Sequence, residues 1–77
     1  MLTLPPDTKI RINGFYYRMV DPTFVKEGDR VLDLRDGCHG ICDKRIDDRI
    51  AIRDGCVIEL AVPLEHVKLL EPIGSEN

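Results

Sequence analysis

Apolar and polar residues alternate with the two-residue period of a β-strand on both sides of Asn13-Gly14. Asn-Gly is the preferred pair for a two-residue type I′ turn, because both central residues of that turn need positive φ. Such a turn pairs Ile12 with Phe15 and Ile10 with Tyr17. Residues 9–20 are therefore predicted to form a β-hairpin. Its apolar face carries Ile10, Ile12, Phe15, Tyr17 and Met19, and its more polar face carries Arg11, Tyr16 and Arg18.

The segment that follows the hairpin predicts a loop and then a short strand. Asp21-Pro22 ends the hairpin, since proline cannot donate to a ladder. In the loop over 23–29 we expect Phe24 to tuck inward. In the strand over 31–34, Val31 and Leu32 point to opposite faces and both are apolar. This pattern predicts a strand covered on both sides, by a barrel core and by the N-terminal hairpin or a partner subunit.

Three more strands are expected from Gly40 onward, and their register depends on the turns. A two-residue turn at Asp47-Asp48 would align Ile46 with Arg49, so we predict a three-residue loop over 47–49 instead. A second three-residue loop over 53–55, with Gly55 in a left-handed conformation, follows from the same reasoning. The apolar set expected on one face is Ile46, Ile50, Ile52, Cys56, Ile58, Leu60 and Val62, with Glu59 turned outward.

The end of the chain predicts one 3₁₀ turn over 63–66 and a closing strand over 67–70. No segment has the period of an α-helix. The predicted organisation is a single domain with an extended arm (1–8), the hairpin (9–20), a small curled β-sheet (23–72) and a frayed tail (73–77).

Several short motifs resemble the KOW-type subgroup of SH3-like barrels. These are Gly28-Asp29-Arg30-Val31, then Gly37-Cys38-His39-Gly40 leading into Ile41, and the closing run from Val62 to Val67. The resemblance covers roughly residues 23–72. It implies a small SH3-like barrel with an N-terminal β-hairpin extension and a short 3₁₀ turn before the last strand. Some members of this subgroup bind nucleic acid, so the resemblance also implies that function as an alternative.

A second similarity is to the plasmid-borne type II dihydrofolate reductases. Thr23-Phe24 and the run from Gly28 to Val31 match the entry to their SH3-like barrel. Their active pore is lined by a Val-Gln-Ile-Tyr segment, whereas this chain has Val57-Ile58-Glu59-Leu60, which lacks both the Gln and the Tyr. The similarity therefore implies barrels that are stable when they pair, and the reductase activity is not carried over.

Composition narrows the classes of function. A chain of 77 residues buries only about 60% of the surface exposed by the unfolded chain, so oligomerisation would help it. The net charge of −3 counts against nucleic acid as the main ligand, because phosphate neutralisation needs a basic excess. Three cysteines, an odd number, favour reduced thiols in the cytosol. No apolar leader or membrane-spanning run is present, and we expect a soluble cytoplasmic protein.

Metal binding and cysteine chemistry are not expected. Cys38, His39, Cys42 and Cys56 are the residue types of a Cys₃His zinc site, but adjacent Cys38 and His39 cannot easily converge on one ion and no C-x₂-C pair is present. Buried or half-buried thiols are the expected state. We predict no metal site, no cofactor and no catalytic residue.

The function that these observations favour is that of a non-enzymatic binding module. Its ligand is expected to be a protein, either a partner or a second copy in a homo-oligomer, as for a phage or mobile-element accessory protein. The expected contact surface, the hairpin surface, consists of Arg11, Tyr16, Arg18, Phe24 and Lys26, where an aromatic ring lies among cations.

Two alternatives remain open. The first is KOW-like nucleic-acid binding through a basic patch of Lys44, Arg45, Arg49 and Arg53, although interleaved aspartates cancel much of its field. The second is a pore-type oligomeric enzyme, as the similarity to the reductases suggests.

Overall fold

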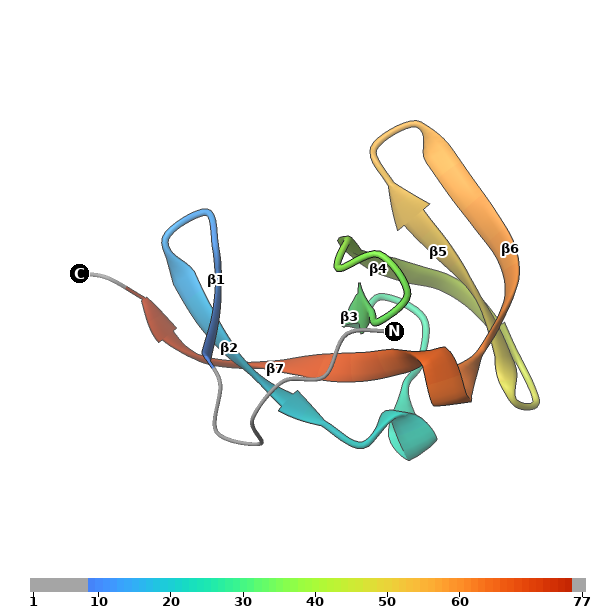
Figure 1. Ribbon diagram of the computed structural model, residues 1–77, viewed down its shortest axis with the longest axis horizontal. Helices are drawn as coiled ribbons and strands as arrows, with labels where there is room; N and C mark the ends of the chain where they lie inside the picture. The colour runs from blue at the N-terminus through green and yellow to red at the C-terminus, as the bar shows by residue number, and fades with distance from the viewer. Residues whose placement is uncertain (1–8, 76–77) are drawn as a thin grey trace.

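A computed structural model describes residues 9–75, which form one antiparallel sheet of seven strands (Figure 1). The strands are β1 (Lys9–Ile12), β2 (Phe15–Val20), β3 (Arg30–Asp33), β4 (His39–Ile46), β5 (Arg49–Asp54), β6 (Val57–Pro63) and β7 (Val67–Ser75). Their order in the sheet is β1-β2-β7-β3-β4-β5-β6. Two 3₁₀ turns, η1 (Pro22–Phe24) and η2 (Leu64–His66), complete the described residues, which contain no α-helix. The all-β prediction and the 3₁₀ turn before the last strand are confirmed, and the predicted arm (1–8) lies outside the described residues.

The N-terminal hairpin has the predicted register. Ile12 pairs with Phe15 and Ile10 with Tyr17. Asn13 has φ of 52° and Gly14 has φ of 81°, as a type I′ turn requires. Phe15 differs from the expectation, because its side chain is 52% exposed and lies outside the core.

The third strand is buried on both faces, as its apolar pattern predicted. Val31 packs into one core with side chains from β4, β5 and β6, and Leu32 packs into a second core with Ile12 and Leu70. Partly buried residues of β1 and β2 pack against this second core. The N-terminal hairpin of the same chain therefore covers the second face of β3.

The last strand connects these two layers. The first residues of β7 pair with β3, and the remainder pairs with β2 as far as Ser75 opposite Phe15. In Figure 1 β7 runs across the molecule, from η2 beside the β5–β6 half to the β1–β2 hairpin. The strand is thus longer than the predicted 67–70, and Gly74 and Ser75 of the expected frayed tail are paired with β2, with Ile73 at a bulge between the paired residues.

The register predicted between β4 and β5 is wrong. The turn has two residues, Asp47 and Asp48, and Ile46 pairs with Arg49. Asp47 adopts φ of 54°, a conformation that aspartate tolerates better than most residues. Pairing Ile46 with Arg49 buries no charge, because both side chains lie on an exposed face of the sheet.

The register predicted between β5 and β6 is also wrong. Asp54 pairs with Val57 across a two-residue turn of Gly55 and Cys56, so Cys56 is in the turn and exposed. Gly55 has φ of 63°, the left-handed conformation expected for it. Ile50 pairs with Val62, and both are buried in the core. The prediction that one apolar face points into the core is therefore wrong for Ile46, Cys56, Ile58 and Leu60.

The loop before β3 buries a different residue from the expected one. Phe24 is 85% exposed, whereas Val25 is 2% exposed and belongs to the core. The Asp21 carboxylate accepts from the backbone N–H of Thr23 and caps η1. Arg45 then donates to the backbone oxygens of Thr23 at 2.6 Å and of Val25 at 2.8 Å. These bonds hold the loop so that Val25 points inward and Phe24 outward.

Candidate functional site

The sixth strand lies at an open edge of the sheet. Within residues 9–75, β6 pairs with β5 on one side and with no strand on the other. In Figure 1 the β5–β6 hairpin projects from the rest of the sheet. An edge strand presents unpaired N–H and C=O groups that can pair with another chain, and proteins commonly protect such edges with charged residues or proline.

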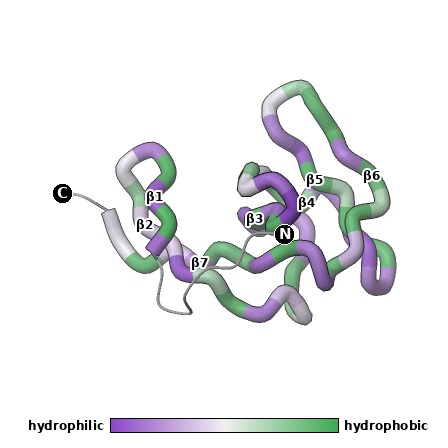
Figure 2. The backbone as a smooth tube through the Cα atoms, in the orientation of Figure 1, coloured by the Kyte–Doolittle hydropathy of each residue, from purple (hydrophilic) through white to green (hydrophobic). Residues whose placement is uncertain are grey.

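The exposed edge is apolar. Val57 is 69% exposed, Ile58 is 47% exposed and Leu60 is 73% exposed, and Figure 2 shows the hydrophobic colour along much of β6. Glu59 is the one charged residue from 57 to 63. Exposure of this apolar surface to water is unfavourable, because burial of apolar surface stabilises a protein by about 25 cal/mol per Å². Removal of this edge from water would therefore be favourable.

The hairpin turn determines which backbone groups of β6 are unpaired. In a two-residue hairpin the residues that flank the turn exchange hydrogen bonds, and successive residues alternate in direction. Val57 flanks the turn opposite Asp54, so Val57 and Glu59 direct their backbone groups to β5. Ile58 and Leu60 then direct theirs to the open side.

A bulge interrupts the strand after Leu60. Four residues of β6, from Glu59 to Val62, lie opposite three residues of β5, from Ile50 to Ile52. Ala61 takes φ of 58°, which is unusual for a residue other than glycine. Its backbone oxygen accepts from Arg49 Nη1 at 3.3 Å. The bulge returns Val62 to the core and marks the end of the regular edge.

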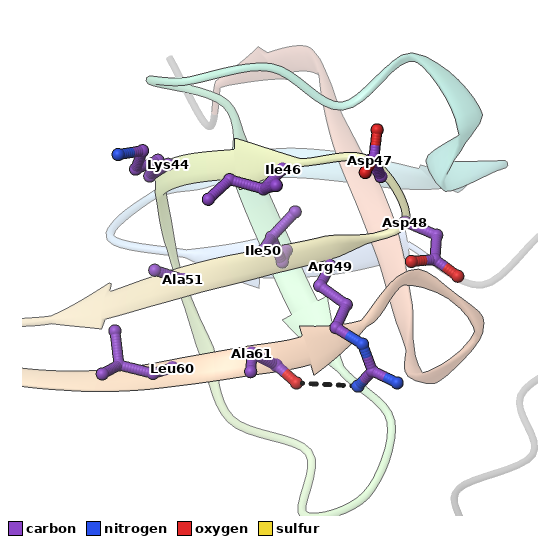
Figure 3. Close-up of a pocket in the computed structure, with 9 residues that line it drawn as sticks. All are labelled: Lys44, Ile46, Asp47, Asp48, Arg49, Ile50, Ala51, Leu60 and Ala61. Carbon is purple, nitrogen blue, oxygen red and sulfur yellow. Dashed lines mark hydrogen bonds between the residues drawn. The ribbon is translucent and has the colours of Figure 1, made fainter.

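A hollow of about 470 Å³ lies beside this edge (Figure 3). It is lined by Lys44 and Ile46 of β4, the turn residues Asp47 and Asp48, three consecutive residues of β5 (49–51), and Leu60 and Ala61 of β6. Cross-strand pairing puts Lys44 and Ile46 on one face of the sheet with Arg49 and Ala51. We call this the outer face. Ile46 is 63% exposed there, so the outer face extends the apolar surface of β6.

On the opposite, inner face, Arg35 connects a buried carboxylate to the edge strand. The Asp33 side chain is 5% exposed. Arg35 donates from Nε to Oδ1 at 3.1 Å and from Nη2 to Oδ2 at 2.7 Å. These hydrogen bonds lower the pKa of Asp33 below its ordinary value, against the opposing effect of burial. Arg35 Nη2 also donates to Glu59, so one guanidinium is shared between the buried carboxylate and the one charge on the edge.

The predicted basic patch is divided between the two faces. Lys44, Arg49 and Arg53 share the outer face, whereas Arg45 pairs with Ile50 on the inner face and binds the loop carbonyls described above. Arg53 donates to the Asp43 carboxylate. The structure therefore brings three of the four cations together, and one of these is already ion-paired.

The predicted hairpin surface is also divided. Arg11 pairs directly with Tyr16, and Arg18 lies two residues farther along β2 and forms an ion pair with Glu71 at 2.6 Å. Phe24 ends η1, which follows the opposite end of β2 from the turn. Lys26 lies beyond it. The five residues thus form two separate groups along the sheet.

The three thiols have different environments. Cys42 is 1% exposed in the core, and burial raises the pKa of its thiol. Cys38 and Cys56 are exposed, which contradicts the expectation of burial for these two. The negative charge of Asp36 raises the pKa of the Cys38 thiol. All three are free, and residues 9–75 contain no group of three potential metal ligands.

The apolar edge of β6 was missed in the sequence because Ile58 and Leu60 were assigned to the core. The available signal was the run from Val57 to Val62, whose one charge leaves an edge strand unprotected. The geometry defines a small all-β protein with an open apolar edge. No protein-family model matches this chain, and neither a curated protein nor a solved structure matches it. Across the part of the chain that the structure covers, no helix is long and apolar enough to cross a membrane.

Proposed function

We propose that this protein is a non-enzymatic binding module that takes a protein partner at the β6 edge. The observation that carries the proposal is an unpaired strand with three exposed apolar side chains: Val57, Ile58 and Leu60. This surface differs from the hairpin surface expected from the sequence. The β6 edge presents unpaired backbone N–H and C=O groups together with exposed apolar side chains.

The binding mode is strand addition. A partner segment in extended conformation pairs with the outward backbone groups of Ile58 and Leu60, which supplies affinity without dependence on the partner's sequence. Selectivity comes from alternate side chains of the partner. Those on the outer face enter the hollow between Ile46 and Leu60, where apolar residues fit best.

The strand order supports the resemblance to SH3-like barrels. The strands β3 to β6 follow one another in the sheet, and β7 returns after η2 to pair with β3. Such barrels serve many functions, so the function is argued from the edge rather than from the fold. The nucleic-acid alternative has weaker support, because Arg45 binds loop carbonyls and Arg53 is paired with Asp43.

Affinity purification from cells of the source organism tests the proposal. We expect Ile58→Lys to lose proteins retained by the wild type, because a lysine on the edge adds an ammonium that strand pairing would bury. Ile73→Lys is the matched control, since Ile73 is 44% exposed and lies on β7, far along the sheet from β6. Equal retention by Ile58→Lys and the wild type would show that β6 is not the binding edge.

A further inference from the structure

We infer that the partner at the β6 edge is a second copy of this chain, paired antiparallel about a twofold axis at Glu59. This inference rests on the proposed function, because it names the occupant of the same edge. Strand β6 is self-complementary in its backbone groups and its side chains, and Arg35 partly compensates its one charge.

The backbone groups match under this symmetry. An axis at Glu59 places Ile58 of one copy opposite Leu60 of the other, and the reverse. These are the two residues whose N–H and C=O groups point away from β5, so each pair exchanges two hydrogen bonds. Glu59 lies on the axis in a pair without hydrogen bonds, consistent with its backbone groups facing β5.

The side chains also match. Ile58 lies on the outer face, because it pairs with Arg53 and alternates with the inward Ile52–Glu59 pair. The twofold axis joins Ile58 and Leu60 of both copies into one apolar strip on that face. Ile46 and the hollow extend the strip in each copy. A shift of the axis to Ile58 would instead pair Val57 with Glu59 and leave Leu60 opposite the turn.

The charge on the axis is partly compensated within each copy. Two Glu59 side chains meet across the axis on the inner face, and directly opposed like charges destabilise a pair of strands. Arg35 of each copy donates to its own Glu59 and also to Asp33, so the guanidinium weakens the repulsion between the two carboxylates at the axis but does not remove it. The bulge at Ala61 ends the strip, which limits pairing to residues 57–61 and predicts a reversible dimer.

Site-specific oxidation tests the axis. In a Cys38→Ser, Cys56→Ser background, Glu59→Cys places two thiols directly opposite each other in a pair without hydrogen bonds, at a Cα separation of about 4.5 Å that a disulfide can span. We expect mild oxidation to yield a covalent dimer. Ile58→Cys in the same background is the matched control, because its opposite residue is Leu60 and not itself. Equal cross-linking of both variants, or more with Ile58→Cys, would overturn the twofold axis at Glu59.

Light scattering of the full chain over a concentration series tests the dimer itself. We expect concentration-dependent dimerisation that Ile58→Lys weakens by about tenfold or more and Ile73→Lys leaves unchanged. A wild type that stays monomeric at millimolar concentration overturns the self-pairing. In that case the proposed function is tested separately, by whether Ile58→Lys loses proteins that the wild type retains. A dimer that survives Ile58→Lys overturns self-pairing at β6.

Discussion

Gly40 is the position at which we expect the largest effect of adding one methyl group. Gly40 is buried on β4, and a Cβ atom there would lie 2.6 Å from the backbone oxygen of Arg53 and 2.6 Å from Cγ2 of Ile52. Ordinary van der Waals contact begins near 3.4 Å. The Gly40→Ala side chain therefore needs close to an ångström of separation between β4 and β5. Neither neighbour gives way easily, since one is backbone and the other is buried.

Overpacking of this kind costs about 1–3 kcal/mol. A chain of 77 residues has a total stability of roughly 4–12 kcal/mol. At about 4–8 °C per kcal/mol for a domain of this size, Gly40→Ala is expected to lower Tm by about 8–16 °C at the middle of the range. Thermal unfolding followed by circular dichroism, with urea unfolding at fixed temperature, measures both quantities.

Gly55→Asn is the control for the loss of a glycine without a clash. Gly55 has φ of 63° with nothing within 4 Å of an added Cβ, and asparagine tolerates that conformation. Its cost is expected to stay within about 1 kcal/mol. If Gly40→Ala has the same Tm as the wild type and Gly55→Asn, then β4 does not lie as close to β5 as the structure places it.

Two further predictions concern backbone strain and pH. Ala61→Gly is expected to raise the free energy of unfolding by up to about 1 kcal/mol in urea titrations, because glycine relieves the positive φ at the bulge. The matched change Ala51→Gly, on the neighbouring strand, should lower it, and a loss of equal size in both variants would refute the strain. The pKa of Asp33 is lowered, mainly by its hydrogen bond to Arg35. Its carboxylate therefore stabilises the folded state at pH values above the ordinary pKa of about 3.9. This stabilisation is lost as the pH falls through the lower pKa that Asp33 has in the folded state. Asp33→Asn should therefore flatten the fall in stability below about pH 4, and parallel curves of stability against pH for the wild type and Asp33→Asn would contradict the assignment.

Local signals in the chain were sufficient for several elements. Asn13-Gly14 specifies its turn through positive φ at two consecutive residues, so the register of β1 and β2 follows from the turn alone. Consecutive Val31 and Leu32 require cover on both faces in any sheet, and both are buried. The turn after Pro63 is too short for an α-helix, and it forms η2. Each prediction depended on neighbours in sequence.

The candidate site could not be predicted in the same way. The turns after β4 and β5 were assigned on the assumption that every apolar residue faces inward. That assumption fails for Ile46 and Leu60, which lie on the outer face and at the edge. Whether a strand is central or at an edge depends on the strands that lie beside it, and β7 bypasses β6 to pair with β3 and β2.

The sequence by itself determined an all-β chain, its first hairpin and a doubly covered third strand, because turn chemistry and two-residue periodicity act over a few residues. Only the tertiary structure decided that the apolar run of β6 remains uncovered in a single chain. The physical reason is that burial is a property of the assembled sheet. The same residues would be core in a central strand and are exposed at an edge.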